Sequence, residues 1–290
     1  MMPNPTEKVP LLATILKINS AYSSFRTAEK RVADYITAHP EEIVYLSITE
    51  LAERSNASEA TIVRMCQQAG FRGYHDLKIV ITQDLVAPLK NIHEDITEDD
   101  DTAAVMQKVF HANMQALENT RAVLDINQME KATQALINAS TVGVLGVGTS
   151  GPIVEDCQYK FMRIGLRCQA FVDPHIQLML IAQLDAGDVL LGISHSGSSR
   201  EVVEAMSAAK EAGVTTICIT GYAKSPITRV SDIRLHTSAV ETKYRMEAVA
   251  SRVAQLSITD ALEVNVALRI KERALAQIRK MENLMPRRKY

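Results

Sequence analysis

The chain has 290 residues, of which 47% are apolar and 23% are charged, and its formal net charge is −2. This composition is typical of a two-domain globular protein and excludes a strongly basic protein that coats nucleic acid regardless of sequence. The four cysteines show no CxxC spacing, so we expect reduced thiols and neither a metal nor another cofactor. Because no apolar run is long enough to span a bilayer and the start shows no convincing cleavage site, we expect a cytoplasmic protein without membrane contact.

Residues 1–90 predict an all-helical bundle of four or five helices. The segment RTAEKRVADYITAHPEEI, 26–43, reads as one helix that Thr27 caps and that Pro40 ends. Its periodic apolar residues are the candidates for the core of the bundle. These are Val32, Ala33, Tyr35 and Ile36.

Two further helices follow in LSITELAERSNASEATIVRMCQQAGFRGYHDLK, residues 46–78. Ser47 and Glu50 form a capping box at the start of the first, and Ser58 caps the second. Asn56 lies between them and tolerates the left-handed conformation that a tight turn requires. This spacing predicts a helix-turn-helix motif.

The second of these helices is expected to lie in a DNA major groove. Its hydroxyl, arginine and glutamine side chains can contact phosphates or base edges, and the basic residues that follow can contact phosphates. The predicted DNA-binding residues are Ser58, Glu59, Thr61, Arg64, Gln67, Arg72 and Lys78. A helical hairpin packed for its own stability remains the alternative, because residues 1–90 hold ten acidic and ten basic side chains.

An acidic segment separates this bundle from the rest of the chain. Six of the eight residues from Glu94 to Asp101 are carboxylates and none is basic, which predicts a solvated linker over 91–103. Asp101 or Thr102 is expected to cap a helix over 103–122, and a second helix is expected over 126–140.

Strands and helices alternate in the last domain, which we place at 104–285. The expected strands are TVGVLGV (141–147), RCQAFV (167–172), DVLLGIS (188–194), TTICIT (215–220) and DIRLHT (232–237), and residues 246–285 are expected to be helical. The alternation predicts βαβ units and a doubly wound, mostly parallel sheet covered on both faces. The predicted fold class is therefore an α/β multidomain protein with an all-α N-terminal domain.

Two loops after predicted strands are rich in glycine and serine. They are GVGTSG, 146–151, and SHSGSS, 194–199, and each precedes a helix. Hydroxyl groups and free amides at a helix start form a phosphate cradle that needs no metal. The predicted ligand-binding residues in these loops are Gly148, Ser150, Ser194, Ser196, Gly197 and Ser199.

A dinucleotide site is an alternative for the first loop. Gly146, Gly148 and Gly151 spell GxGxxG, and Asp173 follows near the end of a strand. That interpretation gives no role to the serines of the second loop.

Together these motifs resemble the RpiR family of transcriptional regulators, which join a helix-turn-helix domain to a SIS (sugar isomerase) domain. The resemblance covers about residues 15 to 285. It is carried by AEKRVADYI, SEATIVRMCQQAGFRGYHDLK, GVGTSG, KFMRIG, SHSGSSRE and SRVAQL.

The resemblance implies that an S-x-S-G-x-[ST] loop holds the phosphate of a phosphosugar. The corresponding residues are Ser194, Ser196, Gly197 and Ser199, with Ser150 from the first loop; the family commonly has threonine at the last position. We expect Asp173, Glu241 and Arg245 to contact the sugar. The resemblance also implies a dimeric or tetrameric regulator of sugar or amino-sugar catabolic genes.

The leading hypothesis is a repressor, not an enzyme, whose phosphosugar effector alters its affinity for operator DNA. Two alternatives remain open. One is a phosphosugar isomerase with an extra N-terminal module, for which His195, Glu201 and Glu241 are the available bases. The other is a redox-sensing regulator that binds NAD(H) at the glycine loop.

Overall fold

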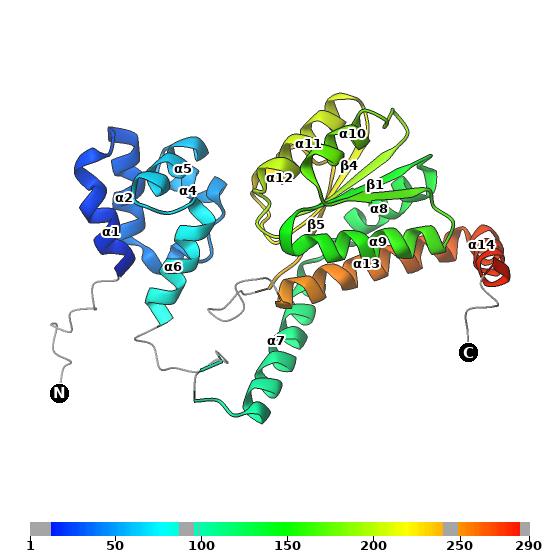
Figure 1. Ribbon diagram of the computed structural model, residues 1–290, viewed down its shortest axis with the longest axis horizontal. Helices are drawn as coiled ribbons and strands as arrows, with labels where there is room; N and C mark the ends of the chain where they lie inside the picture. Colours follow the sequence, from blue (N-terminus) through cyan, green and yellow to red (C-terminus); the bar gives the residue numbers. More distant parts are fainter. Residues whose placement is uncertain (1–12, 87–95, 98, 240–248, 285–290) are drawn as a thin grey trace. The chain divides into compact units, whose positions relative to one another are not determined.

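The computed structural model describes residues 13–86, 96–97, 99–239 and 249–284 (Figure 1). The chain divides near position 98 into two compact units, an N-terminal helical unit and a C-terminal α/β unit. Among the described helices, none combines the length and the apolar character that crossing a membrane requires.

The described part of the helical unit contains six α-helices rather than four or five. They are α1 (Ala13–Ala21), α2 (Thr27–Ala38), α3 (Pro40–Ile43), α4 (Ile48–Arg54), α5 (Glu59–Gln68) and α6 (Tyr74–Val86). Helix α2 ends just before Pro40, as predicted, and Pro40 opens α3, because its missing N–H is not needed at a helix start. The N-cap position of α2 is held by Arg26, one position before the predicted Thr27, and the side chain of Arg26 makes no capping bond.

One apolar core holds these helices together. Val32 and Ile36 of α2, Ile62 and Met65 of α5, and Leu77 of α6 are all fully buried in one cluster. The periodic residues predicted for α2 are buried except Tyr35, whose hydroxyl donates to Glu42 at the surface.

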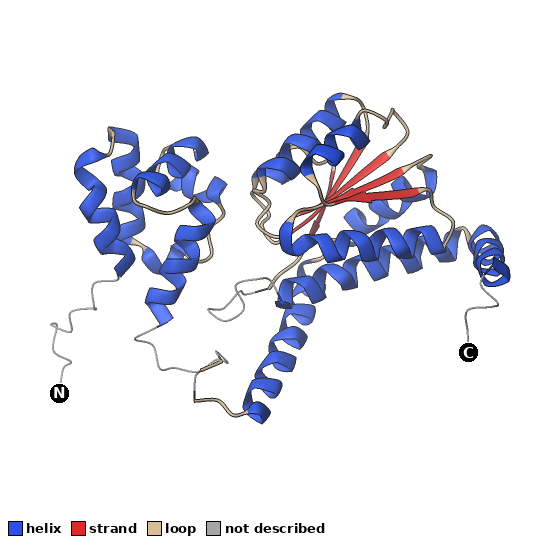
Figure 2. Ribbon diagram, in the orientation of Figure 1, coloured by secondary structure: helices blue, strands red, loops and turns tan. Residues whose placement is uncertain are grey.

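The α/β unit contains a five-stranded, fully parallel sheet (Figure 2). Its strands are β1 (Val142–Leu145), β2 (Cys168–Phe171), β3 (Val189–Ile193), β4 (Thr215–Thr220) and β5 (Ile233–His236), and all five were predicted. Its helices are α7 (Thr102–Val123), α8 (Ile126–Asn138), α9 (Gly151–Arg163), α10 (Pro174–Ile181), α11 (Arg200–Glu211), α12 (Pro226–Arg229), α13 (Val249–Arg269) and α14 (Lys271–Leu284). The end of the chain, which was predicted to be helical, contains two helices over its described residues, α13 and α14.

Helices cover both faces of the sheet, as expected for a parallel sheet. Alternate strand residues such as Val144 and Leu191 join a core with α8, α9 and α13. Their neighbours Leu145 and Leu190 join a second core with α10, α11 and α12.

The strand order is β2-β1-β3-β4-β5, so the chain reverses its direction across the sheet between β1 and β3. In open α/β sheets, ligands bind outside the carboxyl ends of the strands at such a switch point. The two glycine- and serine-rich loops follow β1 and β3 and leave the sheet at this point.

Side chains from two helices occupy the outer edge of β5. The N–H of Arg234 donates to Gln128 Oε1 of α8 at 3.0 Å. The N–H of Ser238, just beyond the strand, donates to Thr120 Oγ1 of α7 at 2.9 Å. These backbone donors, which have no neighbouring strand, are therefore satisfied by side chains.

All four cysteines are buried and unbridged. Burial raises the pKa of Cys66 and Cys168 to about 12 and that of Cys218 to about 11, and it raises the pKa of Cys157 well above its ordinary value. The thiols therefore stay protonated and pack as small apolar side chains.

Candidate functional site

The loop after β1 runs close against the end of β3. A Cβ atom on Gly146 would lie 2.9 Å from the carbonyl oxygen of Ile193, the last residue of β3, and 3.1 Å from Ser150 Cβ. Only glycine permits this approach. Gly148 to Ser150 then form one 3₁₀ turn that leads into α9, with Ser150 buried and Gly148 exposed.

The loop after β3 brings its serine hydroxyls together. Ser194 Oγ and Ser199 Oγ are 3.1 Å apart, and Ser198 donates to Ser196 Oγ through both its N–H and its hydroxyl, at 3.3 and 3.1 Å. Ser194 is buried, whereas Ser196 and Ser199 are half-buried. The loop therefore presents clustered hydroxyl groups beside the start of α11.

Hydrogen bonds from the end of β4, from the loop after it and from the start of α12 hold the serine loop in place. The carbonyl of His195 accepts from the N–H of Gly221 at 2.9 Å and from the Thr220 hydroxyl at 3.2 Å. The carbonyl of Gly197 accepts from the N–H of Ile227 at 2.9 Å. These bonds fix the loop before any ligand arrives, which lowers the entropic cost of binding.

Both helices that follow the loops begin without a side-chain cap. Ser150 precedes α9 and Ser199 precedes α11, but neither hydroxyl accepts a hydrogen bond from the first turn of its helix. Amides at such a helix start attract an anion. Two neighbouring hydroxyl-bearing loops and two helix starts are suited to a phosphoryl group. Among the described residues, no cluster of three histidine, cysteine or acidic side chains is suited to a metal ion.

Of the other three predicted sugar contacts, the structure describes only Asp173. Asp173 caps α10, since its Oδ1 accepts from the N–H groups of His175 and Ile176 at 2.9 and 3.1 Å. The cap uses one carboxylate oxygen of Asp173, which is exposed, and its contact with the sugar stays a prediction. Glu241 and Arg245 lie outside the described residues.

His236, at the carboxyl end of β5, predicts a pH-dependent stability. Burial lowers the pKa of His236, and the charge of Arg234 lowers it further. Below about pH 6.5, the ordinary pKa of histidine, the unfolded chain binds a proton at this residue more readily than the folded chain does. The folded state is therefore less stable below that pH than above it. We expect the free energy of unfolding, measured with urea, to fall between about pH 7.5 and about pH 5.5.

The matched pair of variants is His236→Gln and His175→Gln, since His175 is exposed on α10. The first is expected to reduce the loss of stability between the two pH values and the second to leave it unchanged. An equal loss in both variants would contradict this account of His236.

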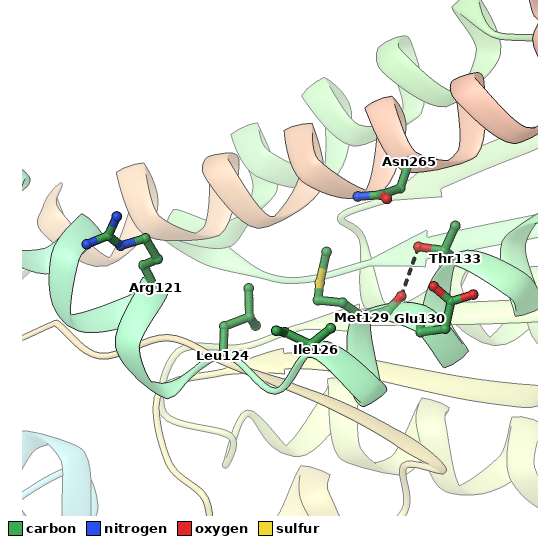
Figure 3. A pocket seen from close by; sticks show the side chains of 7 residues that line it. All are labelled: Arg121, Leu124, Ile126, Met129, Glu130, Thr133 and Asn265. Atoms are coloured by element: carbon green, nitrogen blue, oxygen red, sulfur yellow. Dashed lines mark hydrogen bonds between the residues drawn. The ribbon is translucent and has the colours of Figure 1, made fainter.

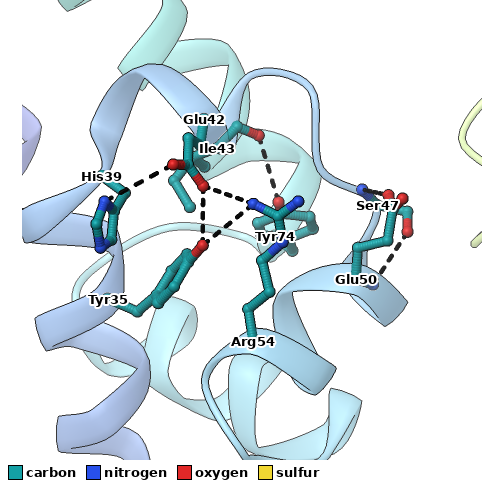
Figure 4. Close-up of polar contacts among 8 residues, drawn as sticks. All are labelled: Tyr35, His39, Glu42, Ile43, Ser47, Glu50, Arg54 and Tyr74. Atoms are coloured by element: carbon teal, nitrogen blue, oxygen red, sulfur yellow. Dashed lines mark hydrogen bonds and ion pairs between the residues drawn. The ribbon is translucent and has the colours of Figure 1, made fainter.

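The helix-turn-helix geometry follows the sequence closely. Ser47 Oγ accepts from the N–H of Glu50 at 3.2 Å, and Glu50 Oε2 accepts from the N–H of Ser47 at 2.8 Å (Figure 4). Ser58 Oγ accepts from the N–H of Thr61, and Asn56 has the predicted left-handed φ of 49°. Thr49 of α4 donates to Glu59 of α5 at 2.5 Å, which joins the two helices beside the turn.

The predicted DNA-binding residues divide by exposure. Ser58, Arg64, Gln67 and Arg72 are exposed, and Glu59 is half-exposed. Two others are corrected, because they face the interior. Thr61 is 6% exposed and its hydroxyl bonds Ser58 Oγ; Lys78 is 9% exposed and donates to the carbonyl of Leu46 at 2.9 Å.

A cluster of polar side chains at the surface, next to the helix-turn-helix motif, includes a further basic residue, Arg54. Arg54, at the end of α4, donates to Glu42 Oε2 at 2.6 Å and to the Tyr35 hydroxyl at 3.3 Å (Figure 4). The Tyr35 hydroxyl donates to the same carboxylate, and this bond together with the nearby charges of His39 and Arg54 lowers the pKa of Glu42. The cluster joins α2, α3 and α4 at the surface of the unit.

A cavity of about 360 Å³ lies elsewhere in the α/β unit, between the end of α7, α8 and α13 (Figure 3). It is lined by Arg121, Leu124, Ile126, Met129, Glu130, Thr133 and Asn265, none of which was a predicted site residue. Most of its polar side chains bond within the chain, since Glu130 pairs with Arg269, Thr133 donates to the carbonyl of Met129, and Asn265 donates to that of Ala261. It offers few groups to a ligand.

Comparison with known proteins identifies the two units. A model of the helix-turn-helix domain of the rpiR family matches residues 13–88, and a SIS domain model matches residues 135–264. An uncharacterized HTH-type transcriptional regulator from Caldanaerobacter subterraneus subsp. tengcongensis is 42% identical over 250 residues, which are 86% of this chain and 89% of that protein. The chain belongs to the RpiR family of transcriptional regulators.

Solved structures share the fold of this RpiR-family regulator. The NanR protein of Vibrio vulnificus, solved in complex with ManNAc-6P, has a TM-score of 0.77 and 24% identity, covering 94% of this chain and 97% of that one. The sugar isomerase domain of an RpiR transcription factor from Sphaerobacter thermophilus has a TM-score of 0.57 and 24% identity, covering 62% of this chain and 98% of that one.

The sheet of the SIS domain also bears on the dinucleotide alternative. A dinucleotide-binding sheet has the strand order 3-2-1-4-5-6, whereas the order observed here is the flavodoxin-like 2-1-3-4-5. The acidic residue of that alternative, Asp173, is used as a helix cap. The GxGxxG spacing of this chain is therefore found without the strand order of a dinucleotide-binding sheet, and its candidate acidic residue acts as a helix cap.

Proposed function

We propose that this RpiR-family regulator senses a phosphorylated sugar through its SIS domain and reads operator DNA through α5. The observation that carries the first half is the pair of serine loops at the switch point, in front of two helix starts without side-chain caps. The proposed phosphate-binding residues are Gly148, Ser150, Ser194, Ser196, Gly197 and Ser199. The proposed DNA-binding residues are Ser58, Glu59, Arg64, Gln67 and Arg72.

Amino-sugar phosphates are the effector class we propose first. Support comes from the fold shared with Vibrio vulnificus NanR, which was solved with ManNAc-6P. We further propose a repressor of sugar or amino-sugar catabolic genes that acts as a homodimer or homotetramer. Its domains would be a DNA-binding domain at 1–90, a linker at 91–103 and a SIS domain at 104–285.

The effector must bind the DNA-competent and DNA-incompetent states with different affinity, because a ligand shifts an equilibrium only by that difference. The loop after β3 is bonded to the end of β4, to Gly221 and to α12, so a phosphoryl group in the cradle would favour whichever DNA-binding state keeps these bonds over a state that lacks them.

The test is a titration of DNA binding by the full chain, on the fragment upstream of its own gene. N-acetylhexosamine 6-phosphates, hexose 6-phosphates and pentose 5-phosphates are compared with the corresponding unphosphorylated sugars. We expect one phosphorylated sugar to weaken DNA binding and its unphosphorylated form to have no effect. A regulator whose DNA affinity no sugar phosphate changes would contradict the proposal.

The same mixtures test the proposal that the chain is not an enzyme. The ring of His195, the residue that an isomerase would use as a base in the serine loop, packs edge-on against Tyr222 with 5.9 Å between ring centroids. We expect no aldose–ketose conversion of any sugar phosphate. Conversion that is lost in His195→Ala would favour the isomerase instead.

A further inference from the structure

A buried carboxylate lies beneath the exposed face of the proposed recognition helix. Glu29 of α2 has a side chain only 1% exposed. One oxygen, Oε2, accepts from the N–H of Arg26 at 2.8 Å and so caps α2. The other, Oε1, lies 3.6 Å from Nε of Arg64 on α5. Burying a carboxylate is unfavourable unless a nearby group compensates its charge, and here that group is Arg64.

The guanidinium of Arg64 is held at a second point as well. Its NH2 donates to Thr61 Oγ1 at 3.2 Å, and Thr61 Oγ1 is 2.8 Å from Ser58 Oγ. The Arg64 side chain is nevertheless 55% exposed. It is therefore accessible from outside while Glu29 on one side and Thr61 on the other restrict its direction.

Capping alone does not explain the charge of Glu29. A glutamine at the same position of a capping box accepts the same backbone hydrogen bond without a buried charge. Stability does not explain it either, because the hydration that a buried carboxylate loses can exceed what its ion pair with a largely exposed arginine returns. The remaining property of the carboxylate is the direction it gives to Arg64.

We propose that Glu29 is a positioning residue that orients Arg64 for reading a base edge in the major groove. This inference rests on the proposed role of α5 in DNA reading. A flexible arginine loses side-chain entropy when it binds, and a guanidinium oriented beforehand loses less. Bidentate contact of arginine with guanine also depends strictly on direction. Glu29 thus acts on base preference through Arg64 without touching DNA.

The experiment uses the full chain and an operator selected by the wild-type protein from a random-sequence duplex library. Affinity is then measured for that operator and for each single-base variant of it. Arg64→Ala identifies the base pair that Arg64 reads. Glu29→Gln keeps the cap of α2 and removes the charge. We expect it to reduce discrimination at that base pair about fivefold, within the range that a bidentate contact supplies, and to leave the other base pairs unchanged.

Glu50→Gln is the matched control. Glu50 caps α4 with the same capping-box geometry, its Oε2 accepting from the N–H of Ser47 at 2.8 Å, and among the described residues it forms no ion pair. We expect it to keep wild-type discrimination at every base pair. Melting temperatures of both variants are measured, and we expect Glu29→Gln to match Glu50→Gln.

Three results would overturn the inference and leave the proposed function intact. The first is wild-type discrimination in Glu29→Gln at the base pair that Arg64 reads. The second is an equal loss of affinity for all sequences together with a lower melting temperature, which indicates a structural role. The third is an Arg64→Ala protein with unchanged base preference. A wild-type protein that selects no sequence would instead overturn the proposed function itself.

Discussion

Gly197→Ala is expected to abolish effector binding and to lower the free energy of unfolding of the SIS domain by about 3 kcal/mol. Gly197 has a φ of +62°, which an L side chain rarely adopts. A Cβ atom there would lie 2.6 Å from Ser225 Cβ and 2.8 Å from Thr220 Oγ1. Both neighbours are fully buried, so neither has room to move aside, and the serine loop would have to shift.

Gly148→Ala measures the stability cost of backbone strain without the packing clash expected at Gly197. Gly148 has nearly the same φ, +58°, but a Cβ atom there has no neighbour within 4 Å. Its expected loss of stability is the strain alone, about 1 kcal/mol. Urea unfolding of the two variants measures the difference, and titration with the effector measures binding. Equal unfolding midpoints would contradict the packing described around Gly197.

Ser196→Ala and Ser199→Ala are each expected to raise the effector concentration needed to change DNA binding by about tenfold. A hydrogen bond to a charged group contributes about 1.5 kcal/mol or more, which corresponds to that factor. Both serines are half-buried residues, so the loss of their hydroxyls should leave the fold intact. DNA affinity without effector should stay at the wild-type value, because the loop lies in the SIS domain.

Ser207→Ala is the control for these two variants. Ser207 lies on α11 beyond the loop, and its hydroxyl donates to Glu211 at 3.3 Å. It should respond to effector as the wild type does. If Ser196→Ala and Ser199→Ala also respond like the wild type, the serine loop does not hold the phosphate.

Local rules of backbone geometry made much of the fold predictable. The capping box of Ser47 and Glu50, the cap at Ser58 and the left-handed Asn56 were all predicted and are all observed. These features depend on a few neighbouring residues, so the sequence contains what is needed. The five strands followed from the alternation of strands and helices. The pairing of β1 with β3, which brings the two loops together, depends on a strand order that the alternation alone does not fix.

Side-chain direction was less predictable, because it depends on neighbours distant in sequence. Thr61 and Lys78 were expected at the DNA surface, yet both face the interior, and Lys78 donates to Leu46, 32 residues earlier. Asp173 was expected to contact the sugar, and the cap that it forms at the start of α10 was not foreseen. Glu29 was overlooked, because the residue three positions before it is Arg26 and not the serine or threonine that marks a capping box in a sequence.

The covered edge of β5 restricts how SIS domains can associate. An open strand edge can accept a strand from another molecule, which leads to continuous sheets between subunits or to aggregates. Gln128 and Thr120 already bond the outward N–H groups at Arg234 and Ser238, so a foreign strand finds those donors taken. Another copy of the regulator that packed against this edge would therefore contact side-chain surfaces. The shape of such surfaces, unlike that of a backbone ladder, can differ from one family member to the next.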